Sequence, residues 1–255
     1  MNLQQLLVSA FDREWGAAVA FDCVSRTHVG LRRKVNEDSV LVRTDRGLWA
    51  VADGMGGHDA GDVASAMVTE ALQRLPIVYG LDELTESAIV ALNGVNHELI
   101  ALAGSGDTQR TIGSTVVGLA IANGQYRCFW AGDSRAYRIR GGQIAQLTRD
   151  HSLVQDLVDA GMLDPEDADN HPNANVITRA VGVVEELQVQ TVSGDARPGD
   201  QFLLASDGLT RLVEAPELLA ELTSRPAAQA AEQLIETVLS RGAPDNVSLI
   251  ITKLN

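Results

Sequence analysis

The 255-residue chain is long enough for one large domain of helices and strands, and its 45% hydrophobic content can fill a sizeable core. Its 34 acidic residues outnumber its 20 basic residues, which gives a net charge of −14, and only 4% of its residues are aromatic. This balance argues against nucleic-acid and anionic-membrane partners, and it suits a protein that holds hard cations with carboxylates.

The cysteines and the N-terminus bear on the compartment. Cys23 and Cys128 lie in apolar strand-like runs, as is typical of reduced core thiols. Charged residues follow the short apolar N-terminal segment without a small-residue cleavage pattern, and no apolar run is long enough to span a bilayer. We therefore expect a cytoplasmic monomer without a membrane partner.

The first half of the chain alternates predicted hairpins and helices. In chain order, the hydrophobic periodicity predicts a lead-in helix at 1–14, strands at 17–24, 39–42 and 48–52, helices at 62–75 and 82–102, and strands at 115–122 and 125–131. Asn123-Gly124 is a strong hairpin turn between the last two strands.

The second half continues this alternation around one irregular stretch. The pattern predicts strands at 136–140, 186–193, 201–205 and 246–254, and helices at 152–160, 216–222 and 226–240. Residues from about 150 to 185 are acidic and irregular, so we expect a mobile surface insertion within a single domain spanning 1–255. Strands in hairpins and helices in pairs favour an α+β fold, with antiparallel sheets packed together and helices on the outer faces.

The apolar stretch that starts at Leu48 carries the first candidate site. It ends at Asp53 and is followed by three glycines within four residues. Glycine allows the backbone at Asp53 and Gly54 to approach a ligand closely, although an ordinary Asp-Gly turn is the alternative. The hairpin before it brings Glu37 and Asp38 near Asp53.

Carboxylates recur at the ends of predicted strands. They stand beside strand ends at Asp38, Asp53, Asp133, Asp207 and Asp245. Because the end of one antiparallel strand lies beside the start of its neighbour, all five can face one rim, with Glu37 nearby. Divalent cations would relieve their repulsion, and oxygen ligands without Cys–His spacing favour Mg²⁺ or Mn²⁺ over Zn²⁺. Five separate turns with solvated acids are the alternative.

A basic cluster precedes these acids. Arg33 lies four residues before Glu37, with Arg32 and Lys34 beside it. Arginine suits a phosphate because its planar fork binds two oxygens, and a solvated basic patch is the alternative. Two hard metals and one arginine suggest phosphate-ester hydrolysis, in which a metal-bridging hydroxide attacks phosphorus in line.

These motifs together resemble the bacterial form of the PPM family (protein phosphatase type 2C), the metal-dependent Ser/Thr protein phosphatases. The matching segments occur in family order and cover the chain from about residue 17 to its end. They are Gly30-Leu-Arg-Arg33-Lys-Val-Asn36-Glu37-Asp38, Val51-Ala-Asp53-Gly54-Met-Gly-Gly, Gly113-Ser-Thr115, Gly132-Asp133-Ser134-Arg135, Leu147-Thr-Arg-Asp-His151-Ser, Ile177-Thr-Arg-Ala-Val-Gly182, Ala205-Ser-Asp207-Gly208 and Asp245-Asn246.

The resemblance implies a four-layer αββα sandwich and a set of roles. The implied metal ligands are Glu37, Asp38, Asp53, Gly54, Asp133, Asp207 and Asp245. Asp53 would bridge two Mn²⁺ or Mg²⁺ ions, and Asp133 with Asp207 would hold a third, weaker ion. Arg33 would bind the substrate phosphate, and the segment at about 150–185 would be the flap beside the active site. The implied partners are phosphorylated proteins and a cognate Ser/Thr kinase.

One position departs from the animal members of the family. They carry a histidine directly after the Asp-Gly pair, proposed to protonate the leaving group, whereas Met55 stands here, as in many bacterial relatives. His58 is a candidate for that role, with a surface histidine or a metal-bound water as alternatives. Two further functions are open: a catalytically silent sensor that binds phosphoprotein or metal, and a hydrolase of small phosphoesters.

Overall fold

A computed structural model describes residues 20–56, 60–78, 80–104, 111–168 and 171–255. The lead-in helix expected at 1–14 and the candidate His58 lie outside the described residues.

Within these ranges, the strands form two antiparallel sheets. One sheet has the spatial order β1 (Phe21–His28), β11 (Val247–Leu254), β10 (Gln201–Ala205), β7 (Arg135–Arg140) and β8 (Gln143–Gln146). The other has the order β2 (Asp38–Arg43), β3 (Leu48–Gly56), β5 (Val116–Ala122), β6 (Gln125–Ala131) and β9 (Gln190–Asp195), and β4 (Ile112–Ser114) pairs with the end of β3.

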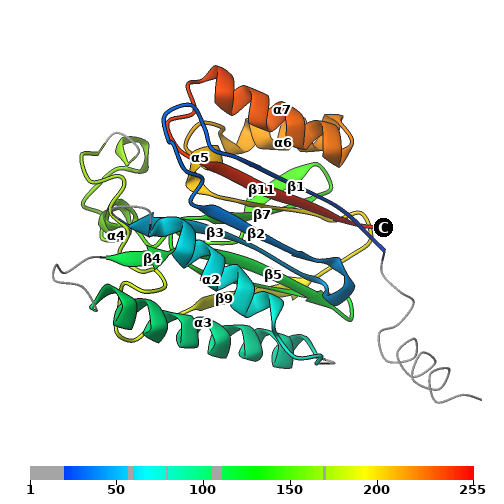
Figure 1. Ribbon diagram of the computed structural model, residues 1–255. Helices are drawn as coiled ribbons and strands as arrows, with labels where there is room; N and C mark the ends of the chain where they lie inside the picture. Colours follow the sequence, from blue (N-terminus) through cyan, green and yellow to red (C-terminus); the bar gives the residue numbers. More distant parts are fainter. Residues whose placement is uncertain (1–19, 57–59, 79, 105–110, 169–170) are drawn as a thin grey trace, which may run out of the picture.

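Helices cover the outer face of each sheet (Figure 1). The pair α2 (Gly61–Gln73) and α3 (Leu81–Ala103) covers the β2–β9 sheet, and the pair α6 (Ala215–Ser224) and α7 (Ala227–Ser240) covers the β1–β8 sheet. The expected four-layer αββα sandwich is therefore confirmed.

Three hydrophobic clusters hold the layers together. One lies under α2 and α3, one under α6 and α7, and one between the sheets. Strand β3 supplies two of them, because Ala50 faces the helices whereas Trp49 and Val51 face the other sheet. Successive side chains of a strand point to opposite faces, so this strand is apolar on both sides.

The segment between β8 and β9 lies where the flap was expected, and we call it the flap. It contains α4 (Leu153–Asp159) and a short 3-10 turn at Pro165–Asp167, and it projects beside the sandwich at the end where β4 lies (Figure 1). Backbone hydrogen bonds join its two arms, from Leu153 N to the Val176 carbonyl at 2.9 Å and from Thr178 N to the His151 carbonyl at 2.8 Å. Its mobility stays a prediction.

Several predicted boundaries were wrong. The first strand was expected at 17–24 but runs from Phe21 to His28, because the whole strand, including its polar second half, pairs with β11. The strand expected at 186–193 runs over Gln190–Asp195, where it pairs with β6. The short strands β4 and β8 and the single-turn helix α5 (Asp207–Thr210) were not predicted.

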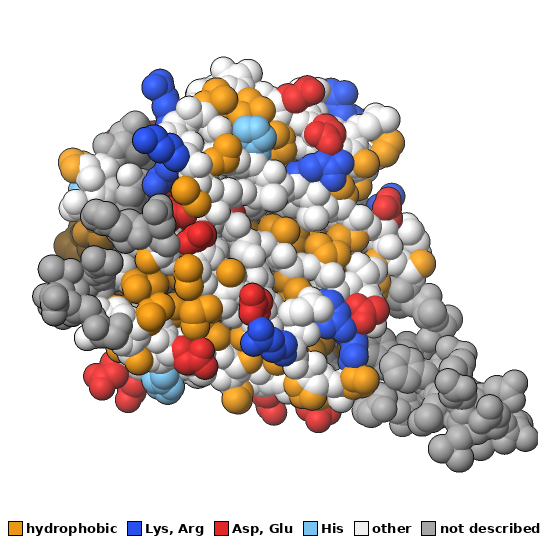
Figure 2. Space-filling view, in the orientation of Figure 1, with side chains coloured by type: hydrophobic (Ala, Val, Ile, Leu, Met, Phe, Trp, Pro, Cys, Tyr) orange, Lys and Arg blue, Asp and Glu red, His pale blue; other side chains and the backbone are white. Residues whose placement is uncertain are grey.

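Two surface properties complete the description. No helix in the described ranges is long and apolar enough to cross a membrane. On the face shown in Figure 2, basic side chains gather at the upper left edge, whereas acidic and basic side chains lie beside each other toward the right.

Candidate metal and phosphate site

Asp53 faces the gap between the sheets at the end of β3. Trp49 and Val51 point toward the other sheet, and the period of two puts the side chain of Asp53 on that same face. In the β2–β3 ladder Asp38 stands directly opposite Asp53. The register of one hairpin therefore sets two acids side by side, as the sequence predicted.

Acids from neighbouring strand ends join this pair. Asp133 follows β6, Asp207 follows β10, and Asp245 precedes β11. The negative charges of Asp207, Asp38, Asp133 and Asp245 all act on Asp53, after burial, to raise the pKa of Asp53 well above its usual range. The predicted acids are thus brought together, and they come from both sheets. We call these five aspartates and Glu37 the acidic cluster.

Burial and mutual repulsion raise the pKa values of several carboxyl groups in the acidic cluster. Loss of hydration raises the pKa of Asp38 to about 6 and that of Asp133 to about 7, and neighbouring carboxylates add to both shifts. The pKa values of Glu37 and Asp207 are also raised, mainly by burial, although Arg33 and Arg211 respectively oppose the shift. Asp53 keeps a partly exposed surface, but protein atoms surround it closely enough for desolvation to dominate.

Two arginines neutralise part of this charge. Arg33 donates to Asp245 Oδ2 at 2.7 Å and lies 3.9 Å from Glu37 Oε2, with its side chain 48% exposed at the rim. On the other side of the acidic cluster, Arg211 lies 2.9 Å from Asp207 Oδ2 and 3.2 Å from Asp133 Oδ2. Arg33 was predicted at this site, whereas Arg211 was not.

Hydroxyl groups fix the aspartates of the β3 hairpin. Thr115 Oγ1 accepts a hydrogen bond from Asp53 N at 3.1 Å and shares another with Ser134 Oγ at 2.8 Å. Ser206 Oγ donates to Asp38 Oδ2 at 2.9 Å. These contacts join both sheets to the same pair of acids.

Asn246 holds the loop that carries Arg33 and Glu37. Its buried amide donates to the carbonyls of Val29 at 2.8 Å and Val35 at 3.0 Å, and its Oδ1 accepts from Glu37 N at 2.8 Å. All three loop contacts come from one side chain next to Asp245. This is the local reason why the loop before β2 and the start of β11 meet at the site.

Close backbone packing requires glycine at two points of the rim. A Cβ at Gly54 would lie 2.0 Å from the Gly61 carbonyl oxygen, and one at Gly208 would lie 1.8 Å from the Asn246 carbonyl oxygen. Any larger residue would push apart the segments that position Asp53 and Asp207.

The donor set fits hard divalent cations. The buried oxygens Asp38 Oδ1 and Asp133 Oδ1 have no hydrogen-bond partner among the described residues, although they lie in a crowded negative environment. Orphaned buried carboxylate oxygens of this kind suit Mg²⁺ or Mn²⁺. No three acidic, histidine or cysteine side chains in the described ranges form a ready metal cage, and the two arginines are paired with Asp245, Asp133 and Asp207. Ions would therefore have to displace or share these ion pairs.

Among the described residues, His151 has a structural role and His97 lies on the surface. His151 is buried, stacks on Trp130 at 6.0 Å between ring centroids, and accepts a hydrogen bond from Gly132 N at Nδ1. Burial lowers the pKa of His151, so it stays neutral and holds the base of the flap. His97 is exposed on α3, as expected.

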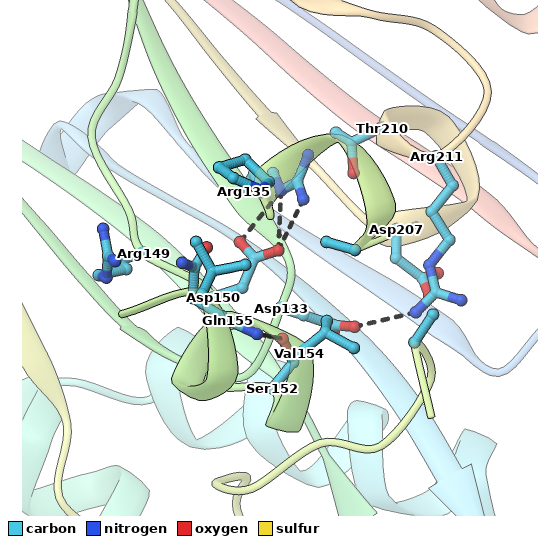
Figure 3. A pocket seen from close by; sticks show the side chains of 14 residues that line it. Asp133, Arg135, Arg149, Asp150, Ser152, Val154, Gln155, Asp207, Thr210 and Arg211 are labelled. Atoms are coloured by element: carbon cyan, nitrogen blue, oxygen red, sulfur yellow. Dashed lines mark hydrogen bonds and ion pairs between the residues drawn. The ribbon is translucent and has the colours of Figure 1, made fainter. Parts of the chain in front are cut away.

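A cleft of about 480 Å³ opens between the acidic cluster and the flap (Figure 3). Asp133, Asp207 and Arg211 line one side, and flap residues such as Val154 and Gln155 line the other. At its base Arg135 binds Asp150 through both carboxylate oxygens, at 2.7–3.0 Å. A polar cleft beside a candidate phosphate site can take an extended peptide.

Arg211 and Asn246 are the site residues whose roles the sequence did not suggest. Asn246 was part of a quoted motif, but nothing in the sequence showed that it would bind a loop more than 200 residues away. Arg211 follows Asp207 by four residues, the spacing of an ion pair on a helix, and that spacing was the available signal.

Comparison with known proteins agrees with this geometry. The family model of protein phosphatase 2C matches residues 28–245. The chain is 37% identical to the Ser/Thr protein phosphatase PstP of Mycobacterium tuberculosis over 89% of its length, and it spans 44% of that longer protein. It is 35% identical to the protein phosphatase PhpP of Streptococcus pneumoniae, covering 90% of this chain and 96% of PhpP.

Solved structures show the same fold. PppA of Pseudomonas aeruginosa, described as a key regulatory component of T6SS, has a TM-score of 0.85 and 40% identity, covering 93% of this chain and 99% of PppA. The catalytic domain of PstP, solved with 2 manganese ions, has a TM-score of 0.83 and 34% identity, covering 93% of this chain and 99% of that domain. With the family model matched over most of its length, the chain belongs to the protein phosphatase 2C family of metal-dependent Ser/Thr protein phosphatases.

Proposed function

We propose that this chain removes phosphate from phosphoserine and phosphothreonine in proteins, as a monomer that opposes a Ser/Thr kinase and uses two Mn²⁺ or Mg²⁺ ions. One observation carries the proposal: acids from both sheets meet at one rim, directly beside an arginine that reaches solvent. The PstP catalytic domain, 34% identical, contains 2 manganese ions.

Asp53 and its neighbours would hold the first ion. Asp53 would contact both ions, because it lies at the centre of the acidic cluster, and the Gly54 carbonyl would add a ligand. Asp207 and Asp245 would complete the first site from the other sheet. Their negative charge is what the ions would offset.

Glu37 would hold the second ion, through water, and Asp38 would support it from below. When bound, the ions would supply a nucleophile by lowering the pKa of water, and they would stabilise the negative charge on the phosphate oxygens in the transition state. Phosphate binding and protonation of the leaving group would fall to side chains of the protein.

Arg33 would bind the phosphate. Its guanidinium is half exposed and pairs with Asp245 at 2.7 Å. Asp245 would also be a ligand of the first ion, and the half-exposed guanidinium of Arg33 would bind two oxygens of the phosphate. The cleft beside the flap would take the peptide on either side of the phosphorylated residue. His58 remains our candidate for protonating the leaving hydroxyl.

Turnover of a phosphothreonine peptide by the full chain, with and without Mn²⁺, tests the proposal. We expect turnover that needs Mn²⁺ and that falls by about three orders of magnitude or more in Asp53→Asn, because that change removes the shared ligand. Asp22→Asn is the matched control, since Asp22 is an exposed acid at the far end of β1, and it should turn over normally.

The competing functions give different results. A silent sensor would bind Mn²⁺ or phosphopeptide but show no turnover above the Asp53→Asn background. A small-phosphoester hydrolase would process p-nitrophenyl phosphate with a higher kcat/KM than any phosphopeptide. The first outcome would contradict the proposed catalysis, and the second would contradict the proposed protein substrate.

A further inference from the structure

Arg211 lies where a third ion would have to bind. The resemblance places a weak third metal between Asp133 and Asp207, and in the structure the guanidinium of Arg211 lies between these carboxylates. Its Nη2 is 3.2 Å from Asp133 Oδ2 and 2.9 Å from Asp207 Oδ2 (Figure 3). One side-chain cation thus contacts one oxygen of each acid.

The short helix α5 fixes the position of the Arg211 backbone. Its backbone N donates to the Asp207 carbonyl at 3.0 Å, so α5 sets Arg211 one turn beyond Asp207. Gly208 packs against the Asn246 backbone and anchors the same turn. The guanidinium therefore reaches the acidic cluster without movement of the main chain.

The same side chain also reaches the flap. Nη1 of Arg211 donates to Asn175 Oδ1, while Nη2 remains with the two aspartates. Asn175 lies immediately before Val176, whose carbonyl holds the other arm of the flap through Leu153. Arg211 is thus a direct polar link between the acidic cluster and the flap.

A guanidinium and a divalent ion cannot share this place. Arginine stays charged at every working pH and binds carboxylates through a flat fork, whereas Mg²⁺ or Mn²⁺ needs a nearly complete shell of oxygens. An entering ion would break both ion pairs and would face the displaced positive charge at close range. Asp133 is 5% exposed, so its remaining carboxylate oxygen offers a poor second route from solvent.

We propose that Arg211 is a built-in cation that replaces the third divalent ion, so that this chain works with two ions, and that it ties the flap to the acidic cluster. Arg211 is thus a positioning residue for Asp133, Asp207 and the flap. This inference rests on the proposed two-ion site, and the tests below separate the two.

Counting bound Mn²⁺ tests the first part without any substrate. In equilibrium dialysis at millimolar Mn²⁺, we expect about two ions per wild-type chain and about three in Arg211→Ala and Arg211→Asp, with tighter third-ion binding in Arg211→Asp because it adds a carboxylate. Arg211→Lys keeps the charge and should stay near two.

Arg26→Ala is the matched control for loss of an ion-paired arginine. Its side chain is 37% exposed, like that of Arg211, and it pairs with Glu232 on α7, on the outer side of the β1–β8 sheet. This variant should bind as many ions as the wild type. Three ions in the wild type, or an unchanged count in Arg211→Ala, would overturn the replacement of the third ion. A wild-type chain that binds none contradicts the two-ion proposal instead.

Hydrogen exchange of residues 171–178 tests the second part. We expect at least severalfold faster exchange there in Arg211→Ala and also in Asn175→Ala, which cuts the flap contact alone. The two variants should differ in metal count, because only Arg211→Ala frees the aspartates. Unchanged exchange in both would remove the proposed link to the flap, whatever the metal count.

Discussion

Arg33 has two kinds of partner available at the rim. In the structure it pairs with Asp245 and lies near Glu37, so its charge lowers the pKa of Glu37 against the effect of burial. A bound phosphate offers the same guanidinium two oxygens in a plane. The acids therefore hold the arginine where a substrate would find it.

Replacing Arg33 should weaken substrate binding more than chemistry. For Arg33→Ala we expect the KM for a phosphothreonine peptide to rise roughly 10- to 100-fold, since a charge-assisted hydrogen bond contributes about 1.5–3 kcal/mol. Steady-state kinetics at saturating Mn²⁺ measure it. Arg32→Ala, at the exposed neighbouring position, is the control and should keep the wild-type KM. Equal effects in both variants would place the binding energy elsewhere.

At the scale of elements, the loop before β2 depends on one buried amide. Asn246 binds Val29, Val35 and Glu37 across the junction of β1, β2 and β11. Without these contacts the loop would no longer be held beside Asp245.

Asn246→Ala should therefore lose metal affinity as well as stability. We expect unfolding to cost on the order of 2–3 kcal/mol less, because buried carbonyl and amide groups lose their partners. Chemical denaturation measures the stability, and Mn²⁺ titration measures the affinity. The control is Asn93→Ala, since the Asn93 amide donates to the Ile89 carbonyl within α3, on the outer face of the β2–β9 sheet (Figure 1). Unaltered Mn²⁺ affinity in Asn246→Ala would show that the loop before β2 keeps its position without the Asn246 side chain.

The elements that the sequence predicted well have strong local signals. The strand Gln201–Ala205 was placed correctly because Phe202–Ala205 is an apolar run, and Asn123-Gly124 marked the hairpin of β5 and β6. The strand Gln143–Gln146 was missed because it is a short, mostly exposed edge strand that forms against β7. The acids could be predicted because strand ends are visible in sequence, whereas the partners of Asn246 and Arg211 depend on packing between distant segments.

At the scale of the molecule, the acidic cluster opposes folding when no metal is bound. The pKa values of Asp38 and Asp133, about 6 and about 7, lie above the ordinary value of 3.8, so the folded chain holds these protons more tightly than the unfolded chain. Metal-free stability is then greatest at low pH within this range and falls as pH rises through about 6–7.

Thermal unfolding in EDTA should show this loss. We expect the Tm to fall between about pH 5 and about pH 8, and the fall to be much smaller in Mn²⁺. Asp38→Asn cannot ionise, so the metal-free variant should gain on the order of 2 kcal/mol over the wild type at pH 8. Acids with lowered pKa values, such as Asp200, act at lower pH and do not enter this window. A Tm that rises from pH 5 to pH 8 in EDTA would contradict the origin proposed here.

The aspartates of the acidic cluster come from different sheets, with Asp38, Asp53 and Asp133 on one and Asp207 and Asp245 on the other. Ions bound between them would tie the two sheets together at this rim. Any change that separates the sheets, such as heating, proteolytic cleavage or a core mutation, would then abolish activity rather than reduce it. Phosphatase activity would thus depend on the integrity of the whole sandwich.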